Sequence, residues 1–313
     1  MMTRALALLL LWAPQGALPK KSYVFKEAGG VRIELDVHRA DTADVLPVVV
    51  WIHGGALLMG GRNGVPRNLL DLCRDEGYAL VSIDYRLAPQ VKVPDIIEDV
   101  KEAFRWVRGR GAEIAHLDPH RIVVAGGSAG GYLTLMTGIA VDPKPLALVA
   151  YWGYGDVDGD WYTKPSEHYR KTVPLYSREQ ALQGLKDEVV TAPPDPAQGE
   201  ARSRYYHYLR QNGLWTREVT GLDPEKDRAK LDPFCPVRNV TPAYPPTLLV
   251  HGTADTDVPY ELSAAMDGEM ERHKVEHVLV TVPGSGHGLS GGDRKLVGEA
   301  HAKALAFIKK HLK

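Results

Sequence analysis

The sequence predicts an α/β fold with a mostly parallel central sheet flanked by helices. Continuous apolar, β-branched runs alternate with amphipathic segments along the 313 residues, a pattern typical of strands buried by helices on both faces of a sheet. A glycine-rich turn, Gly126–Gly131, joins one such run to a helix-forming segment. A long aromatic segment then separates two of the later strands, which indicates an insertion rather than a bare loop.

The elements follow from local patterns taken in chain order. Residues 23–37 alternate apolar and polar side chains around Gly29-Gly30, which predicts an antiparallel hairpin at a sheet edge. The other expected strands are 48–52, 78–84, 121–125, 146–151, 247–250 and 278–282. The expected helices are 69–74, 94–108, 132–140, 260–273 and a last one that runs to residue 313. Residues 116–120 are expected in a loop because Pro119 interrupts any helix.

The turn between residues 126 and 131 carries the first chemical signal. A buried strand leads into it and a helix follows, so the backbone must turn sharply at Ser128, and the flanking glycines leave room for such a turn. This context is typical of a nucleophile elbow, in which the serine hydroxyl projects from the end of a sheet. The alternative is a phosphate-binding turn at a helix N-terminus.

A serine hydroxyl needs a base and usually a carboxylate that orients the base. His287 lies in a glycine-rich loop directly after the last strand, where the carboxyl ends of parallel strands meet. Asp255 and Asp257 both follow the strand before it. We favour Asp255 as the orienting acid because it lies in the turn that leaves the strand, whereas Asp257 stands where an aspartate ordinarily caps the next helix.

An oxyanion hole is predicted at His53-Gly54-Gly55-Ala56, which directly follows a strand. Backbone N–H groups of Gly54 and Gly55, together with that of Ala129, can turn toward developing negative charge. The alternative is a glycine-rich loop without a catalytic part. His53 is interpreted as a hydrogen-bonding brace for the loop.

The segment 152–243 is interpreted as a cap inserted over the end of the sheet toward which the elbow points. It is rich in tyrosine and tryptophan, and Trp152, Tyr154 and Trp161 are candidate substrate-pocket residues. Such aromatic side chains either stack on sugar rings or a feruloyl group of the substrate, or they fill the cap's own core. Aromatic enrichment alone does not separate these two interpretations.

Composition and the N-terminus limit the partners and the compartment. The net charge of −1 gives no reason to expect a nucleic acid or an electrostatic attachment to a membrane. Residues 1–18 combine Arg4, an apolar run and small residues, which predicts a signal peptide and a secreted or periplasmic protein; a cytoplasmic N-terminal helix is the alternative. With only two cysteines, the chain has no disulfide framework, although one bridge or two free thiols are both compatible with it.

An acidic stretch that begins at Asp156 resembles a calcium loop, with Glu167 at its twelfth position. Trp161 occupies the sixth position, where the sharp turn of such a loop requires glycine. We therefore expect an acidic turn rather than a calcium site.

These motifs together resemble the hormone-sensitive-lipase-like and acetyl-esterase-like branch of the α/β-hydrolase superfamily. The resemblance rests on His53-Gly54-Gly55, Asp84–Pro89, Gly126–Gly131, His251–Asp255 and Gly286-His287-Gly288, and it runs from about Tyr23 to Lys313. It implies an α/β-hydrolase core at 19–151 and 244–313 with the cap at 152–243, and a carboxylic ester hydrolase that needs no metal or cofactor. It also implies Ser128 as nucleophile, His287 as base, Asp255 as orienter, and Gly54, Gly55 and Ala129 as oxyanion donors. Ala56 departs from relatives that carry a third glycine there.

The expected activity is hydrolysis of carboxylic esters through an acyl-enzyme, on short-chain acyl groups or on acetyl or feruloyl groups linked to carbohydrate. The alternatives are an amide or peptide hydrolase, of the aminopeptidase or arylformamidase kind, and a ligand-binding module without catalysis. The expected partner is a small-molecule or carbohydrate-linked ester, and the oligomeric state is left open.

Overall fold

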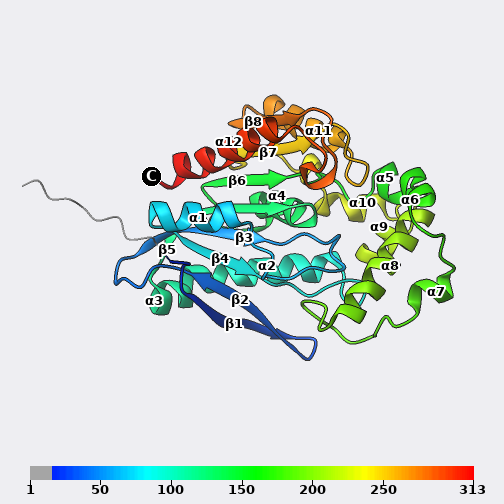
Figure 1. Ribbon diagram of the computed structural model, residues 1–313, viewed down its shortest axis with the longest axis horizontal. Helices are drawn as coiled ribbons and strands as arrows, with labels where there is room; N and C mark the ends of the chain where they lie inside the picture. Colours follow the sequence, from blue (N-terminus) through cyan, green and yellow to red (C-terminus); the bar gives the residue numbers. More distant parts are fainter. Residues whose placement is uncertain (1–15) are drawn as a thin grey trace, which may run out of the picture.

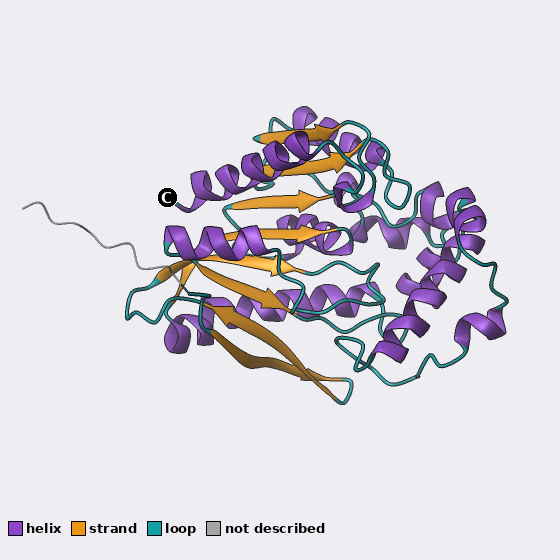
Figure 2. Cartoon of the chain, viewed as in Figure 1, coloured by secondary structure: helices purple, strands orange, loops and turns teal. Residues whose placement is uncertain are grey.

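The computed structural model describes residues 16–313 and contains one eight-stranded sheet with helices on both of its faces (Figures 1 and 2). The strand order is β1-β2-β4-β3-β5-β6-β7-β8; β1–β2 and β2–β4 pair antiparallel and all other neighbours pair parallel. The strands are β1 Lys20–Ala28, β2 Val31–His38, β3 Leu46–Ile52, β4 Ala79–Ile83, β5 Leu117–Gly127, β6 Ala147–Tyr151, β7 Thr247–Gly252 and β8 His277–Val282. The predicted fold class and the predicted edge hairpin are both confirmed.

Each face of the sheet has its own hydrophobic core. On one face, α1 (Arg67–Glu76) and α12 (Arg294–Leu312) pack against side chains such as Val49 and Val123. On the other face, α2 (Val93–Trp106), α4 (Ala129–Ala140) and α11 (Tyr260–Arg272) pack against alternate residues of the same strands, such as Val50 and Val124. Successive side chains of a strand point to opposite faces, so strands covered on both faces read as continuous apolar runs.

Two stretches differ from the expected elements. The helix expected over 94–108 ends at Trp106 and continues as a π-helical turn, η1 (Val107–Gly111), and a short helix, α3 (Ala112–Ala115). The loop expected at 116–120 lies partly within β5. Leu117 is buried and pairs with Leu46 before a register shift, and the extra residues of this irregularity accommodate Pro119 without a ladder donor.

Between β6 and β7 the described chain has no strand and forms a helical layer beyond the carboxyl ends of the parallel strands (Figure 1). Its elements are α5 Asp160–Thr163, α6 Glu167–Thr172, α7 Arg178–Leu182, α8 Pro196–Asn212, α9 Trp215–Thr220, α10 Arg228–Leu231, η2 Asp232–Phe234 and η3 Pro236–Arg238. We call this layer the cap. The predicted domain boundaries at 151/152 and 243/244 stay predictions. In the structure, strand β6 ends at Tyr151 and the next strand, β7, begins at Thr247.

The remaining expectations concern the N-terminus, membrane-spanning helices, metal ions and the two cysteines. The predicted signal peptide, 1–18, falls almost wholly on residues 1–15, which lie outside the described residues. From residue 16 onward, no helix is both long and apolar enough to cross a bilayer. Within the same range no cluster of three or more His, Cys, Asp or Glu side chains is arranged to hold a metal ion. Cys73 and Cys235 are both buried and free.

Candidate active site

The turn after β5 has the strained geometry that a nucleophile elbow requires. Ser128 stands between the end of β5 and the first residue of α4, with φ 57° and ψ −123°, a conformation that non-glycine residues rarely adopt. A Cβ on Gly126 would lie 2.3 Å from the Gly130 carbonyl oxygen, and one on Gly130 would lie 2.0 Å from that of Ile52. Only glycines permit this close approach of three backbone segments, and the turn holds the Ser128 side chain at the end of the sheet.

Three side chains from three separate loops form a continuous hydrogen-bonded chain at this turn. His287 Nε2 lies 3.1 Å from Ser128 Oγ, and His287 Nδ1 lies 2.8 Å from Asp255 Oδ2. With Nδ1–H donating to the carboxylate, Nε2 is left as the acceptor for the serine proton. The structure therefore brings together the three residues that the sequence predicted as nucleophile, base and orienter.

The carboxylate of Asp255 is held on both of its oxygens. The backbone N–H groups of Asp257 and Val258 each donate to Oδ1 at 2.9 Å, while Oδ2 accepts from His287. His251 lies behind it, fully buried, with Nε2 3.4 Å from Oδ2 and 2.9 Å from the Val258 carbonyl oxygen that it donates to. Burial raises the pKa of Asp255, but the hydrogen bonds from His251 and His287 and the His287 charge lower it more, so the net pKa is well below its ordinary value.

Opposing effects also set the basicity of His287. Burial lowers the pKa of its imidazole, whereas the hydrogen bond to Asp255 and the negative charges of Asp257 and Asp255 raise it; the net pKa is above its ordinary value. A base of this kind is well suited to take a proton near neutral pH.

The loop after β3 lies against the elbow. A Cβ on Gly54 would lie 3.2 Å from Ser128 Cβ, and Gly55 has φ +114°, with a Cβ there only 2.1 Å from the Met59 carbonyl oxygen. The N–H groups of Gly54, Gly55 and Ala129 donate to no acceptor within the described residues. Unpaired N–H groups on the loop after β3, where Gly54 lies against Ser128, and at the first residue of α4 suit the stabilisation of an oxyanion.

His53 fits its expected role as a brace. Its Nδ1 lies 2.8 Å from the Gly54 carbonyl oxygen, and its ring stacks on Tyr85 at 4.2 Å between centroids. The Tyr85 hydroxyl in turn donates to the His53 carbonyl oxygen. Complete burial lowers the pKa of His53 to about 4, so the ring is neutral and holds the loop without acting as an acid.

Side chains of the cap hold this loop from the other side. Trp215 Nε1 donates to the Ala56 carbonyl oxygen at 3.0 Å. Arg202 Nη1 of α8 donates to the carbonyl oxygens of Leu58 and Ala88, each at 2.8 Å. Ala56 itself has φ 55°, a left-handed conformation that tertiary contacts must impose on a residue with a Cβ. The loop after β3 is therefore shaped jointly by the core and the cap.

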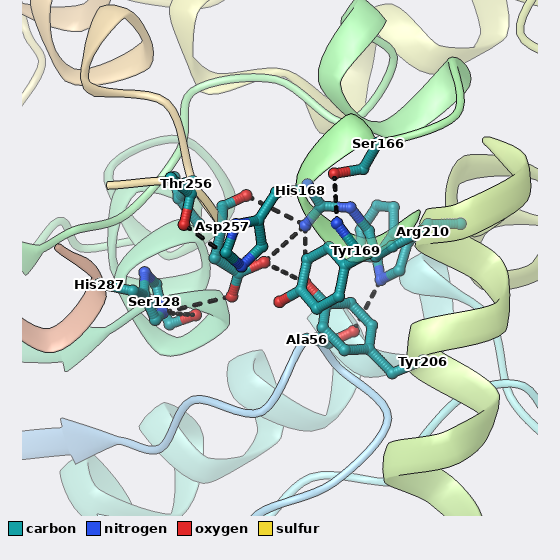
Figure 3. Close-up of polar contacts among 12 residues, drawn as sticks. Ala56, Ser128, Ser166, His168, Tyr169, Tyr206, Arg210, Thr256, Asp257 and His287 are labelled. Carbon is teal, nitrogen blue, oxygen red and sulfur yellow. Dashed lines mark hydrogen bonds and ion pairs between the residues drawn. The ribbon is translucent and has the colours of Figure 1, made fainter. Parts of the chain in front are cut away.

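Asp257 does not have the helix-capping role expected for it. The N-cap of α11 is Pro259, and Asp257 instead faces the cap, where its Oδ1 accepts from Arg210 Nη1 at 2.6 Å and from the Tyr206 hydroxyl (Figure 3). Its other oxygen, Oδ2, lies 3.6 Å from His287 Nε2. Asp257 lies two residues before that N-cap, and its carboxylate is engaged by the charged donor of Arg210, 47 residues away in the chain.

The cavity that opens at Ser128 has a volume of about 290 Å³ and lies against the core rather than within the cap. Its walls are mostly apolar and aromatic. The lining residues are Trp51, Gly54, Gly64, Pro66, Asn68, Leu69, Gly127, Ser128, Tyr151, Trp152 and His301. The Trp152 ring also meets the His287 ring edge-on, with centroids 6.3 Å apart, so this candidate pocket residue lies beside His287.

The other two candidate pocket residues, Tyr154 and Trp161, lie away from this cavity. Tyr154 is fully buried and stacks on Tyr132 with centroids 4.9 Å apart, while Trp161 packs edge-on against Tyr154 and donates from Nε1 to Asp156. Neither lines the cavity at Ser128. Of the two interpretations of the aromatic segment, these residues follow the core one. The hydrogen bond also ties Asp156 to Trp161 at the start of α5.

Three further residues at the site were missed: Arg210 and Tyr206 of the cap and His251 behind Asp255. Only His251 had a local signal, since it lies at the carboxyl end of β7 in the His251–Asp255 motif. Arg210 and Tyr206 stand on a long helix whose pattern gives no indication that they meet the loop after β7.

Comparisons with known families agree with this architecture. A family model described as BD-FAE matches residues 35–169, and the model of the prolyl oligopeptidase family matches residues 199–313. The first range contains the serine turn and the loop after β3, and the second contains Asp255 and His287. Each match covers less than half of the chain.

Individual relatives are distant. Esterase LipC of Mycobacterium tuberculosis is 29% identical over 268 residues, which cover 85% of this chain and 59% of LipC. A non-reducing polyketide synthase of Aspergillus calidoustus is 25% identical over 92% of this chain, but the chain spans only 14% of the length of that synthase. Among solved structures, a hyperthermophilic esterase of the archaeon Pyrobaculum calidifontis has a TM-score of 0.68 at 22% identity, covering 95% of this chain and 85% of the other. This last likeness shows a shared fold.

Proposed function

We propose that this chain of α/β-hydrolase fold, whose relatives include an esterase, is a serine hydrolase that cleaves carboxylic esters through an acyl-enzyme. The observation that carries this proposal is the hydrogen-bonded chain from Ser128 Oγ through His287 to Asp255, with distances of 3.1 and 2.8 Å. This series of hydrogen bonds ends at the Ser128 hydroxyl, which lies on a strained turn beside unpaired backbone N–H donors.

In the acylation step, His287 Nε2 takes the Ser128 proton as Oγ attacks the ester carbonyl carbon. The negative charge that develops on the carbonyl oxygen is stabilised by the N–H groups of Gly54, Gly55 and Ala129. Asp255 keeps Nδ1 protonated and stabilises the imidazolium. The imidazolium then gives its Nε2 proton to the departing alcohol oxygen, and the acyl group remains on Ser128.

Deacylation repeats the sequence with water as the nucleophile. His287 accepts a water proton, the new carbon–oxygen bond forms, and Ser128 leaves after it receives that proton. The cavity of about 290 Å³ beside Ser128, walled by Trp51, Leu69 and Trp152, supports a short-chain or aromatic group as one half of the ester. Acetyl and feruloyl groups linked to carbohydrate are both within that size.

The first test is turnover of p-nitrophenyl acetate by the purified protein and by its Ser128→Ala and Asp255→Asn variants. We expect Ser128→Ala to abolish turnover above background and Asp255→Asn to lower kcat by about 10⁴-fold, because the wrong imidazole tautomer then faces the serine. Equal turnover by wild type and Ser128→Ala would refute Ser128 as the nucleophile, whereas no turnover above background by wild type would favour a ligand-binding module.

An amide or peptide hydrolase is the second candidate, favoured by the match of residues 199–313 to the prolyl oligopeptidase family. The same groups would serve it, since attack on an amide carbonyl also needs a nucleophile, a base and an oxyanion hole. A panel of p-nitrophenyl esters and aminoacyl p-nitroanilides separates the two. Higher kcat/KM for the anilides would replace the esterase proposal by the peptidase one.

A further inference from the structure

The described residues place a second carboxylate on the serine side of His287. Asp255 binds Nδ1, whereas Asp257 presents Oδ2 to the other ring nitrogen, 3.6 Å from Nε2 (Figure 3). That distance is too long for a direct hydrogen bond. Oδ2 accepts a hydrogen bond from no described residue, and the side chain is 18% exposed. An unused acceptor therefore faces the space where the leaving group and the attacking water must lie.

The position of this carboxylate is fixed from the cap. Arg210 Nη1 donates to both the side chain and the backbone carbonyl of Asp257, at 2.6 and 3.0 Å, and Tyr206 donates to the same Oδ1. Arg210 is 3% exposed and its guanidinium lies 5.0 to 5.7 Å from the ring centroids of four aromatic side chains. These rings are Trp161, Tyr162, Tyr169 and Tyr206. With Oδ1 saturated by cap donors, the carboxylate can turn only Oδ2 toward the reaction.

The separation of the two groups matches the span of one bridging water molecule. Hydrogen bonds of about 2.8 Å from one water to Nε2 and to Oδ2 span a separation of 3.6 Å with an angle of about 80° at the water oxygen. That angle is close enough to the angle between its two O–H bonds for both to donate. In such a water one proton points to the base and the second to Asp257, so a lone pair is free to face the acyl carbon.

We propose that Asp257 orients the water that hydrolyses the acyl-enzyme, and that Arg210 and Tyr206 of the cap are positioning residues for this carboxylate. The inference rests on the proposed acyl-enzyme chemistry. Water attacks the carbonyl carbon, one of its protons passes to His287 Nε2, and the second stays on the new hydroxyl while Oδ2 accepts its hydrogen bond. The carbon–Oγ bond then breaks, the Nε2 proton passes to Ser128 Oγ, and the carboxylic acid leaves.

This role separates the two halves of the reaction. Acylation uses Ser128 Oγ–H, which donates directly to Nε2 and has no second proton for Asp257 to accept. In deacylation the attacking water does carry a second proton, which Asp257 can accept in a hydrogen bond. Methanol, used as an alternative acceptor for the acyl group, resembles serine because its single hydroxyl proton goes to His287. Loss of Asp257 should therefore slow hydrolysis selectively and spare both acylation and methanolysis.

The test is stopped-flow kinetics of p-nitrophenyl acetate with Asp257→Asn, Arg210→Lys and, as a matched control, Asp160→Asn, which removes an equal charge from an exposed site on the cap. The Asp257→Asn variant keeps an acceptor oxygen for Arg210 and Tyr206 and replaces Oδ2 by an N–H₂ donor. We expect a burst of p-nitrophenol with full amplitude and a rate within about threefold of wild type, followed by a steady state slowed about 10- to 100-fold. Arg210→Lys should show a smaller effect of the same kind.

The second readout is the ratio of methyl acetate to acetate formed in dilute methanol, which is independent of the amount of active enzyme. It should rise about 10- to 100-fold in Asp257→Asn and stay unchanged in Asp160→Asn. An unchanged ratio, or an equal fall of burst and steady-state rates, overturns the proposal and makes Asp257 a residue of acylation or folding. If wild type shows no burst and Ser128→Ala turns over equally, the proposed function itself fails, whatever Asp257→Asn does.

Discussion

A single methyl group on Gly54 should disable the oxyanion loop without unfolding the chain. In Gly54→Ala the new Cβ would lie 2.7 Å from the Gly127 carbonyl oxygen and 3.2 Å from Ser128 Cβ. Since carbon and carbonyl oxygen ordinarily stay at least about 3.3 Å apart, the loop and the elbow must separate by about 0.6 Å. Gly54 does not have a positive φ, so alanine can adopt its backbone conformation and the strain is confined to this contact.

We expect Gly54→Ala to impair catalysis more than folding stability. A shift of that size moves the N–H groups of Gly54 and Gly55 away from the oxyanion, and the loss of one such donor costs about 3 kcal/mol in the transition state, or about 100-fold in kcat. KM should change little, because these donors act mainly on charge that develops in the transition state. Overpacking costs about 1 to 3 kcal/mol of folding free energy, which lowers Tm by several degrees.

Steady-state kinetics with p-nitrophenyl acetate and thermal unfolding measure the two effects on the same samples. Gly268→Ala in α11 is the matched control, because a Cβ there meets nothing within 4 Å and alanine is the better helix former. A Gly54→Ala enzyme whose kcat stays within threefold of wild type would show that the donors do not depend on this contact. A large rise in KM with unchanged kcat would equally refute the argument, since it would mean that the loop only binds substrate.

Two further predictions concern the base and the cap. The pKa of His287 is raised above its ordinary value, so kcat/KM should fall as pH drops through that raised pKa, because a protonated imidazole cannot take the Ser128 proton. Initial rates across the pH range measure this fall, and a midpoint below the ordinary pKa of histidine would contradict the assignment. Trp215→Phe removes the donor to the Ala56 carbonyl oxygen and should lower kcat about 2- to 12-fold, the effect of one hydrogen bond, whereas Trp106→Phe, remote from the site, should leave kcat unchanged. Equal kcat in the two tryptophan variants would mean that the cap does not shape the loop.

The fold and the three residues at Ser128 were predictable because their signals are local. Each lies directly after a buried strand, and the carboxyl ends of parallel strands meet at one edge, so sequence order alone brings Ser128, Asp255 and His287 together. Asp255 was distinguished from Asp257 by its place in the turn. The structure agrees with that choice in placing Asp255, not Asp257, within hydrogen-bond distance of His287 Nδ1.

The cap side of the site was not predictable because it depends on contacts between distant residues. Tyr206 and Arg210 meet Asp257 across 51 and 47 residues, and Trp215 meets Ala56 across 159. Helix α8 has polar and aromatic residues on several faces, so its sequence does not show which face meets the core. The same ambiguity holds for Tyr154, since a buried tyrosine and a pocket tyrosine look alike in sequence.

The contacts between the cap and the core bear on the route by which substrate reaches Ser128. Arg202 and Arg210 are both buried, and lifting the cap would separate them from the Leu58 carbonyl and the Asp257 carboxylate. Breaking one buried charged pair costs about 3 to 5 kcal/mol, so a fully lifted cap would be populated less than about once in a hundred molecules. The cavity at Ser128 is instead bounded by β3, the segment before α1, the end of β6 and α12, all outside the cap helices. Entry along this core-side cavity needs no such break, and the cap can then hold the oxyanion loop and Asp257 in place throughout the reaction.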